Sequence, residues 1–209
     1  MGHIITIASS KGGAGKTALC MVLAGNLAAL GRNPAVVDAD PNRSFSDWCA
    51  YNYEGAPLHC IAETRETAVV EQAQALAETH GVVLIDTAGF GNRTALMATG
   101  TADLVLIPVM PDRHSVREAI RTAEEVASVA RMTRRPIPVR AVGSRWHRNG
   151  LAERAATADL SAAGVVMARG TLPALSAMDK ATFSGDVPLV GSVGVAVDQL
   201  LREVQEVVG

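Results

Sequence analysis

The fold of this 209-residue chain is decided by the stretch Ser9-Ser10-Lys11-Gly12-Gly13-Ala14-Gly15-Lys16-Thr17. It follows an apolar run at residues 4–8 and opens a helical pattern at residues 16–30, which is the strand–loop–helix context of a phosphate-binding loop. The glycines allow backbone N–H groups to approach a phosphate, and the helix N-terminus adds partial positive charge. Lys16 can reach the β- and γ-phosphates, and the Thr17 hydroxyl can bind Mg²⁺.

The loop departs from the standard spacing G-x-x-x-x-G-K-[ST], because that pattern requires glycine at position 10, where this chain has Ser10. Lys11 follows instead, in the sequence K-G-G-x-G-K-T. The alternative interpretation is a glycine-rich turn with two incidental lysines. The position of the loop between a strand and a helix favours phosphate binding.

Short apolar runs alternate with helical patterns along the chain, and the runs are continuously apolar, as in parallel strands covered on both faces. We therefore predict an α/β fold, a single doubly wound, mostly parallel β-sheet with helices on both faces, as in P-loop NTPases. Ligands of such sheets bind at the C-terminal strand ends. The expected strands span residues 4–8, 35–38, 58–61, 82–86, 104–109, 139–142 and, more weakly, 165–167, and the expected helices span residues 16–30, 67–79, 115–131 and 195–208.

The composition fits one domain spanning residues 1–209, since 48% of residues are hydrophobic, 19% are charged and the net charge is -2. There is no C-x-x-C pair among Cys20, Cys49 and Cys60, so we expect neither disulfides nor a zinc site, and we interpret the three as buried apolar side chains. No charged stretch precedes a long apolar run at the N-terminus, so no signal peptide is expected. These features predict a cytoplasmic protein.

The K-G-G-A-G-K-T sequence resembles the deviant Walker A motif of the ParA/MinD family of ATPases, and of small plasmid-partition ParA proteins in particular. Three further stretches resemble motifs of that family in the same order: its second-strand motif at residues 36–44, its Walker B strand at 83–89 and its proline-containing strand end at 107–111. The resemblance covers about residues 3–112. It implies ATP and Mg²⁺ as cofactors and a slow, partner-stimulated hydrolysis of ATP to ADP and phosphate.

The resemblance also implies roles for individual residues. Lys11 would reach across an ATP-sandwich homodimer to the phosphates bound by the partner, much as an arginine finger does, so hydrolysis would depend on dimerisation. Lys16 would bind the phosphates and Asp40 would position the attacking water, so Lys11, Lys16 and Asp40 are the expected catalytic residues. The expected nucleotide contacts are Lys11, Gly12, Gly13, Ala14, Gly15, Lys16, Thr17, Ala18 and Gly89.

The expected Mg²⁺ ligands are Thr17, Asp38 and Asp86, the two carboxylates acting through waters. Two departures from the family pattern concern this region. Asp86-Thr87-Ala88-Gly89 replaces the common Asp-x-Pro-Pro and is closer to the D-x-x-G switch of GTPases, but no N-K-x-D guanine motif follows, so ATP is retained. Asn42 stands where the family usually has glutamine, which leaves the hydrolysis rate open.

Positive charge is concentrated in residues 113–154, which contain ten Arg and four acidic residues for a net charge of +6, against -8 for the remainder. Arginine suits phosphate recognition, so this stretch predicts a surface for nonspecific DNA, and Trp146 adds an aromatic side chain within it. The alternative is a solvated helix face, with Trp146 covering the edge of the core. The candidate DNA-binding residues are Arg117, Arg121, Arg134, Arg135, Arg145 and Arg148.

The favoured function is an ATP-dependent partition or positioning ATPase that dimerises on ATP, binds nonspecific DNA on the nucleoid and segregates a plasmid, chromosome region or protein cargo. A ParB-like or centromere-binding protein would stimulate its hydrolysis. The alternative is a MinD-like regulator on the membrane, which needs a basic amphipathic C-terminal helix. Residues 198–208 carry one Arg and three acids, so no membrane binding is expected. An iron–sulfur relative is disfavoured, because no Cys follows Cys60.

Overall fold

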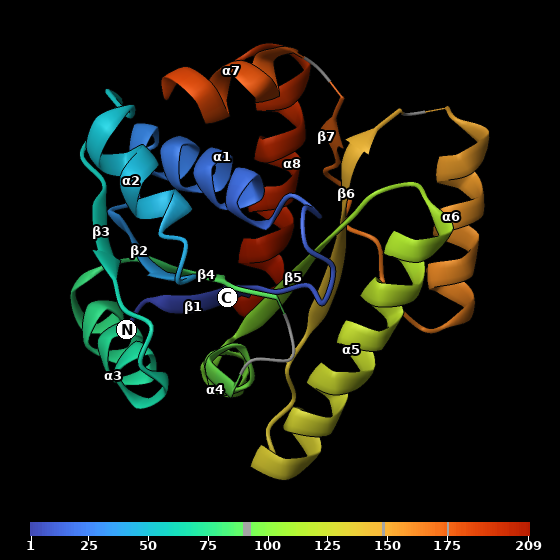
Figure 1. Ribbon diagram of the computed structural model, residues 1–209, viewed down its shortest axis with the longest axis horizontal. Coiled ribbons are helices and arrows are strands. Elements are labelled where there is room, and N and C mark those ends of the chain that lie inside the picture. The colour runs from blue at the N-terminus through green and yellow to red at the C-terminus, as the bar shows by residue number, and fades with distance from the viewer. Residues whose placement is uncertain (90–92, 148, 175) are drawn as a thin grey trace.

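The computed structural model describes residues 1–89, 93–147, 149–174 and 176–209, and its centre is a parallel β-sheet (Figure 1). Neighbouring strands follow the order β3-β2-β4-β1-β5-β6-β7, and every pairing is parallel. This confirms the predicted α/β fold. The strands are β1 (His3–Ile7), β2 (Pro34–Ala39), β3 (His59–Ala62), β4 (Val82–Thr87), β5 (Leu104–Val109), β6 (Val139–Trp146) and β7 (Leu172–Pro173).

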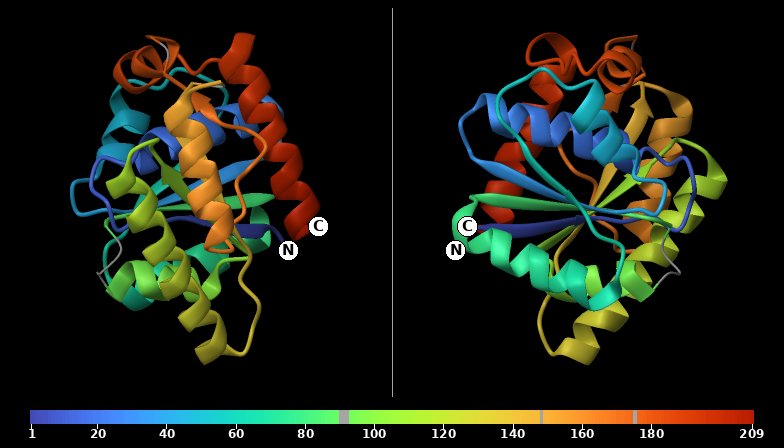
Figure 2. Two further views of the ribbon diagram at one scale, coloured as in Figure 1. Left: turned by 90° about the vertical axis from the view of Figure 1, so that its right-hand side faces the viewer. Right: turned by 60° about the vertical axis from the view of Figure 1, so that its left-hand side comes forward.

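Helices cover both faces of the sheet, as Figure 2 shows with the sheet seen between two helical layers. One layer packs into the core that contains Ile5 and Ile7 of β1, and the other packs on the opposite face. The first layer comprises α1 (Lys16–Ala29), α2 (Ser44–Tyr51), α7 (Ser176–Ser184) and α8 (Gly191–Val208), and the second comprises α3 (Glu66–Thr79), α4 (Arg93–Thr101), α5 (Arg113–Thr133) and α6 (Leu151–Ala162).

The continuous apolar runs are explained by this double cover. In β5, Leu104 and Leu106 join the core under α1 and α8, whereas Val105 and Ile107 join the core under α5 and α6. Successive side chains of a strand point to opposite faces, so a strand buried on both faces has no polar alternation. All six residues of β5 are buried.

Three local expectations differ from the structure. The weak strand expected at residues 165–167 makes only an isolated bridge between Met167 and Ala141, and β7 lies later in the chain. The helix expected at residues 16–30 ends one residue earlier, at Ala29, so Leu30 is 61% exposed before Gly31 turns the chain with a φ of 67°. The short helices α2, α4, α6 and α7 were not predicted.

The strand order brings three chain segments together at one edge of the sheet. β1 is central and lies between β4 and β5, so the loop after β1 emerges beside the end of β4. The register pairs Ile7 with Asp86, and Asp38 with Asp86 on the next strand. The predicted carboxylates therefore lie next to the predicted phosphate loop.

Candidate functional site

The loop between β1 and α1 has the backbone that a phosphate cradle requires. Gly13 and Gly15 have φ values of 72° and 97°, in the left-handed region that favours glycine. A Cβ on Gly15 would also lie 2.7 Å from Ser144 Oγ, whereas Cβ atoms on Gly12 or Gly13 would meet nothing within 4 Å. The loop is thus closed against β6 at Gly15 and open where an anion would sit.

Lys16 begins α1 and is 8% exposed. Burial lowers the pKa of its ammonium group, and the negative charges of Asp86 and Asp40 partly oppose this effect. No carboxylate of the described residues forms an ion pair with Lys16. A buried cation at a helix N-terminus with this environment is suited to an anionic ligand.

Asp86 is the penultimate residue of β4 and is fully buried. Burial raises the pKa of its carboxyl group to about 7, a trend that Asp38 and Asp40 reinforce and that Thr17 and Lys16 oppose. Neither carboxylate oxygen has a hydrogen-bond partner among the described residues. A buried acceptor without a donor costs free energy, and a cation beside the Thr17 hydroxyl would satisfy it. These residues fit Mg²⁺.

Asp38 is also fully buried, but its oxygens are already engaged. One oxygen accepts a hydrogen bond from Asp40 N at 3.2 Å, and the other accepts from Ser46 N and Ser46 Oγ, both at 2.8 Å. Asp38 therefore fastens the start of α2 to the end of β2. This arrangement supports a positioning role for Asp38 and leaves Asp86 as the unsatisfied carboxylate.

Asp40 lies at the mouth of the site, where its Oδ1 accepts hydrogen bonds from Asn42 N and Nδ2, both at 2.9 Å. Asn42 thus orders the segment that carries the predicted water-positioning carboxylate. A cavity of about 540 Å³ brings most of the predicted nucleotide contacts together. Its lining residues are Gly12, Gly13, Gly15, Lys16, Thr17, Ala18, Asp40, Pro41, Asn42, Ala88 and Gly89.

Two predicted residues are absent from the lining of that cavity. Ala14 is fully buried beneath the loop. The Lys11 side chain pairs with Asp112, with Lys11 Nζ 3.0 Å from Asp112 Oδ2. Asp112 is also the N-cap of α5, where its Oδ1 accepts a hydrogen bond from Ser115 N at 2.8 Å. In the single chain, the Lys11 side chain is therefore held at the start of α5 and does not line the cavity beside its own phosphate loop.

Ser10, the residue that replaces the standard glycine, also contacts α5. Its hydroxyl donates to Glu118 O at 3.1 Å, and Thr122 Oγ1 accepts from Ser10 N at 3.2 Å. The first part of the phosphate loop is therefore fastened to α5 at three points along the helix.

A second cavity of about 400 Å³ adjoins the first and shares Gly13, Gly15 and Ala18 with it. It extends between the end of β6 and the β7–α7 region, so it has the position and size for the base and ribose of a nucleotide. Sequence reasoning did not assign its further lining residues to the nucleotide, because only Met110 lies in one of the motifs and Arg145 was assigned to DNA. The further lining residues are Met110, Ser144, Arg145, Leu172, Pro173, Ala174, Ser176, Met178, Asp179 and Thr182.

The predicted DNA-binding arginines do not form one group. Arg117 and Arg121 lie on the exposed face of α5, and Arg134 is exposed at its C-cap, although Arg121 Nε is 3.3 Å from Glu125 Oε1. Arg135 is instead structural, since it pairs with Asp103 and donates to two carbonyls at the end of α4.

The other two predicted arginines lie beyond α5 in the sequence. Arg145 lines the cavity next to the phosphate loop. Arg148 lies outside the described residues.

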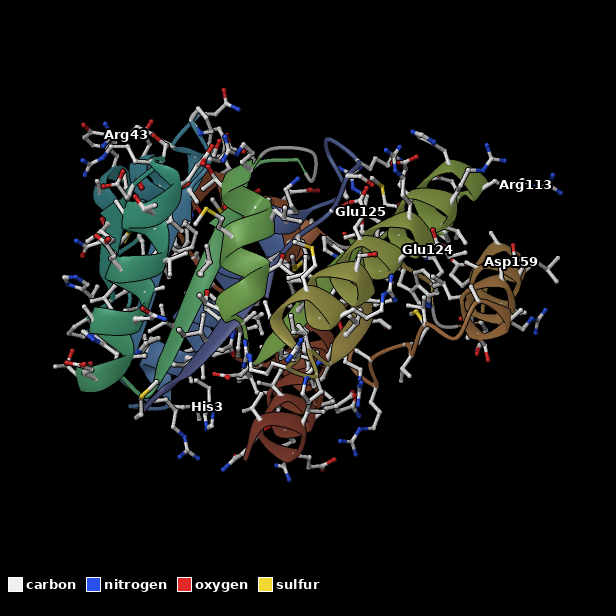
Figure 3. All side chains as sticks on the ribbon, turned by 90° about the horizontal axis from the view of Figure 1, so that it is seen from below. His3, Arg43, Arg113, Glu124, Glu125 and Asp159 are labelled. Atoms are coloured by element: carbon white, nitrogen blue, oxygen red, sulfur yellow. The ribbon has the colours of Figure 1, made fainter. Side chains whose placement is uncertain are left out.

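The exposed face of α5 carries an arginine that the candidate set omitted. Arg113, Arg117 and Arg121 follow one another at helical spacing, and all three are exposed. Figure 3 shows Arg113 projecting from the start of α5, with Glu124 and Glu125 further along the helix. Trp146 is 7% exposed within the hydrophobic core, so it is a core residue and not a stacking surface for nucleic acid.

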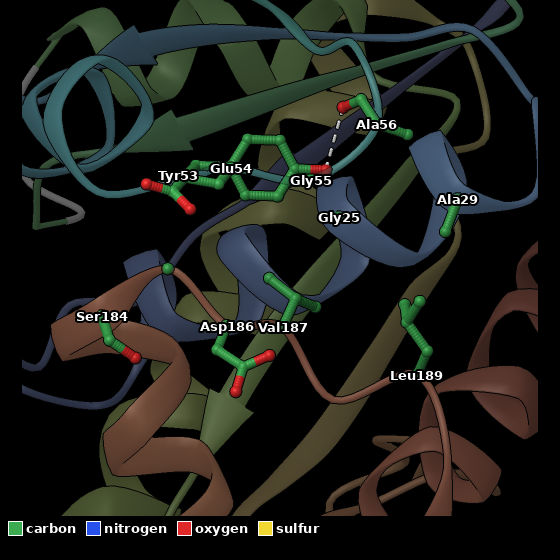
Figure 4. Close-up of a pocket in the computed structure, with 11 residues that line it drawn as sticks. Gly25, Ala29, Tyr53, Glu54, Gly55, Ala56, Ser184, Asp186, Val187 and Leu189 are labelled. Atoms are coloured by element: carbon green, nitrogen blue, oxygen red, sulfur yellow. Dashed lines mark hydrogen bonds between the residues drawn. The ribbon is translucent and has the colours of Figure 1, made fainter.

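A third cavity, of about 300 Å³, lies between α1, the α2–β3 connection and the α7–α8 connection (Figure 4). None of the phosphate-loop residues 9–17 lines it. Tyr53 Oη donates a hydrogen bond to Ala56 O at 3.0 Å across this connection.

In the parts of the chain that the structure describes, no helix is long and apolar enough to cross a membrane.

Comparison with known proteins agrees with this geometry. The family model described as VirC1 protein matches residues 2–173. ParA from Rhizobium radiobacter is 34% identical over 108 residues, covering 52% of this chain and 49% of the relative. VirC1 from Rhizobium rhizogenes is 31% identical over 150 residues, covering 65% of each chain.

The solved structure of the septum site-determining protein MinD with Mg-ADP, from Pyrococcus horikoshii, shares the fold. It superposes with a TM-score of 0.75 at 16% sequence identity and covers 100% of this chain and 98% of its own. The matched part of the chain covers between 49% and 65% of the length of these curated relatives.

Proposed function

The chain belongs to the VirC1 family, within the wider ParA/MinD family of ATPases, and from this premise we propose that it is an ATP-dependent partition or positioning ATPase. The observation that carries the proposal is the buried carboxylate of Asp86, whose oxygens have no hydrogen-bond partner in the described parts of the chain and whose pKa, raised by burial, is partly lowered by the neighbouring Thr17 hydroxyl and Lys16 ammonium groups. Such a carboxylate is suited to binding the metal ion that accompanies a nucleotide phosphate, because the bound cation compensates its negative charge.

ATP would lie across the two adjoining cavities. Backbone N–H groups of residues 12–17 would hold the β-phosphate, Lys16 would bind the β- and γ-phosphates, and the base would enter the cavity beside β6 and α7. Bound Mg²⁺, held by Thr17 and Asp86, would neutralise charge on the phosphate oxygens. Asp40, ordered by Asn42, would orient the attacking water at the mouth of the site.

Dimerisation would complete the site. Lys11 is held by Asp112 in the single chain, so an in-trans role requires this exposed ion pair to exchange for the γ-phosphate bound by a second copy. The exchange would remove one of the three contacts that fasten the phosphate loop to α5, while those of Ser10 with Glu118 and Thr122 would remain. The exposed arginines of α5 would then serve nonspecific DNA in the ATP-bound dimer, and a ParB-like partner would stimulate hydrolysis.

A membrane-bound regulator is the second candidate, but the observed packing of α8 does not support it. Val193, Val197, Leu200 and Val204 form the apolar face of α8, and all four are buried in the core. An interfacial helix needs a free apolar face. The same helix carries Glu203, which pairs with Arg140 inside the protein.

Nucleotide binding tests the first step of this proposal. Lys16→Ala removes the cation that compensates the phosphates, so binding of a fluorescent ATP analogue, measured by titration with Mg²⁺, should weaken by at least about 100-fold. Lys180→Ala is the matched control, because Lys180 is an exposed lysine that pairs with Asp186 on the surface. Tight ATP binding by the Lys16→Ala protein would refute the phosphate site.

A further inference from the structure

Two histidines lie together at the end of the sheet that is opposite the phosphate loop. His59 begins β3, and His80 follows α3 and precedes β4, so both lie at the N-terminal ends of strands, whereas the phosphate loop follows the C-terminal end of β1. Their imidazole ring centroids are 5.3 Å apart, with an angle of 34° between the ring planes. His59 is exposed and His80 is partly buried, so solvent reaches the pair.

The His80 ring is held in one orientation by the end of α3. Its Nδ1 lies 3.2 Å from Leu76 O and 3.0 Å from Thr79 Oγ1. A carbonyl oxygen can only accept, and the Thr79 hydroxyl can accept as well while it donates its own hydrogen to Leu76 O. These partners assign the ring proton to Nδ1, which leaves the lone pair of Nε2 for another ligand.

The His59 ring has no such restraint. No hydrogen bond or ion pair of this side chain is found within residues 1–89, 93–147, 149–174 and 176–209. β3 stands at the edge of the sheet beside β2 (Figure 1), and the exposed His59 side chain can change rotamer there. His80 is therefore the fixed member of the pair, and His59 is the adaptable one.

The spacing of the two rings suits a single metal ion. Bonds from Zn²⁺ to imidazole nitrogen are about 2.0–2.1 Å long, so two imidazoles on one tetrahedral ion have ring centroids roughly 5 Å apart. A metal-bound histidine commonly donates its other ring N–H to a backbone carbonyl, as His80 does to Leu76. Imidazole nitrogen is also a preferred ligand of Zn²⁺.

We propose that His59 and His80 form a binding site for Zn²⁺, in which His80 Nε2 and one ring nitrogen of His59 are the protein ligands. Among the described residues, no group of three or more His, Cys, Asp and Glu side chains gathers, so water completes the coordination of the ion. The bound ion joins the edge strand β3 to the end of α3. It therefore stabilises the folded chain, because the unfolded chain does not hold the two rings together.

The expectation of no zinc site rested on the absence of a C-x-x-C pair, and that pattern does not detect histidines that only the fold brings together. The cysteines themselves match the expectation of burial only in part. Cys20 is buried, whereas Cys49 and Cys60 are partly buried free thiols. Such thiols can also bind Zn²⁺, so the test has to follow each histidine individually.

Nuclear magnetic resonance of the imidazole nitrogens tests the site directly. The full-length protein is labelled with nitrogen-15, kept reduced and free of nucleotide at a pH where imidazole is neutral, and titrated with zinc chloride. The metal-free spectrum should show the Nδ1–H form of His80. Zn²⁺ should then shift His80 Nε2 and one His59 nitrogen over the same concentration range, and it should raise the unfolding temperature. A proton on His80 Nε2 in the metal-free protein, or a shift of only one ring, would overturn the proposal.

Matched variants show whether the two rings act together. His59→Asn and His80→Asn each leave one imidazole, so the dissociation constant of Zn²⁺, read from the shift of the remaining histidine, should rise at least about tenfold. His114→Asn, at an exposed position of α5, is the control and should bind as the wild type does. Circular dichroism identifies a variant that fails to fold, and the joint shift in the wild type then decides the question. Unchanged affinity in both folded variants would contradict the proposed site.

Discussion

At the scale of single residues, Asp38 and Asp86 show how one side-chain type takes opposite roles on adjacent strands. Asp38 accepts three hydrogen bonds from the protein, and Asp86 accepts none from the described residues. Both are fully buried and follow apolar runs, so the sequence predicted their place at the sheet edge. It could not distinguish their roles, because Ser46, which engages Asp38, carries no motif.

This difference predicts opposite effects of the same substitution on stability. Burial gives Asp86 a pKa of about 7 in the folded protein against 3.8 for the free side chain, so the folded state binds this proton more tightly than the unfolded state. Its contribution to stability is complete below about pH 4 and is lost as the pH rises to about 7. Asp86→Asn should therefore stabilise the ligand-free protein at pH 8 by on the order of 2–4 kcal/mol.

Urea unfolding without Mg²⁺ or nucleotide, measured between pH 4 and pH 8, checks this expectation. Asp38→Asn is the control, and it should destabilise the protein by about 1–3 kcal/mol, because both Asp38 oxygens accept hydrogen bonds and an amide retains only one acceptor oxygen. Equal destabilisation by both variants would show that Asp86 has a structural partner after all.

At the scale of secondary-structure elements, α5 connects the phosphate loop with the basic surface. Its buried face packs on β5, and its N-cap Asp112 holds Lys11. The charge count located the basic stretch, but it could not separate arginines at the surface from Arg135, which binds carbonyls at the end of α4. That distinction depends on tertiary contacts between α4 and the segment after α5.

The arginines along the exposed face of α5 are expected to contact DNA phosphates. Replacing Arg113, Arg117 and Arg121 together by Ala should weaken binding to nonspecific duplex DNA and reduce the slope of log K against log salt concentration by about 2–3. Fluorescence anisotropy across a salt series measures that slope. Arg202→Ala on α8, an exposed arginine paired with Asp198, is the control. A slope identical to that of the wild type would place the DNA surface elsewhere.

The helix α8 is fixed to the sheet by a buried carboxylate. Glu203 is 6% exposed, and its oxygens accept hydrogen bonds from Arg140 Nε and Arg169 N, both at 2.7 Å. Glu203→Gln should lower the free energy of unfolding by about 2–5 kcal/mol, because it leaves Arg140 uncompensated. Glu206→Gln should change it by less than about 1 kcal/mol, since Glu206 is exposed. Thermal unfolding of both proteins compares them, and similar midpoints would contradict this account.

At the scale of the whole molecule, the parallel sheet and its layers followed from the apolar runs, because their continuity already requires burial on both faces. The site was predictable where backbone chemistry demands particular residues, as at Gly15 and Lys16. The cavity beside β6 and α7 was not, because any side chains of suitable size can surround a base.

The central claim is that ATP switches the whole molecule into a DNA-binding dimer, and a gel shift on nonspecific DNA with and without ATP and Mg²⁺ tests it most directly. Lys11→Ala and Lys16→Ala proteins are run beside the wild type, light scattering reports the mass of each, and liposomes replace DNA in a parallel set. The account predicts that the wild type gives a shifted band and a doubled mass only when ATP and Mg²⁺ are present. The two variants should give neither under any condition. DNA binding that is independent of ATP, or ATP-dependent binding to liposomes in place of DNA, would contradict it.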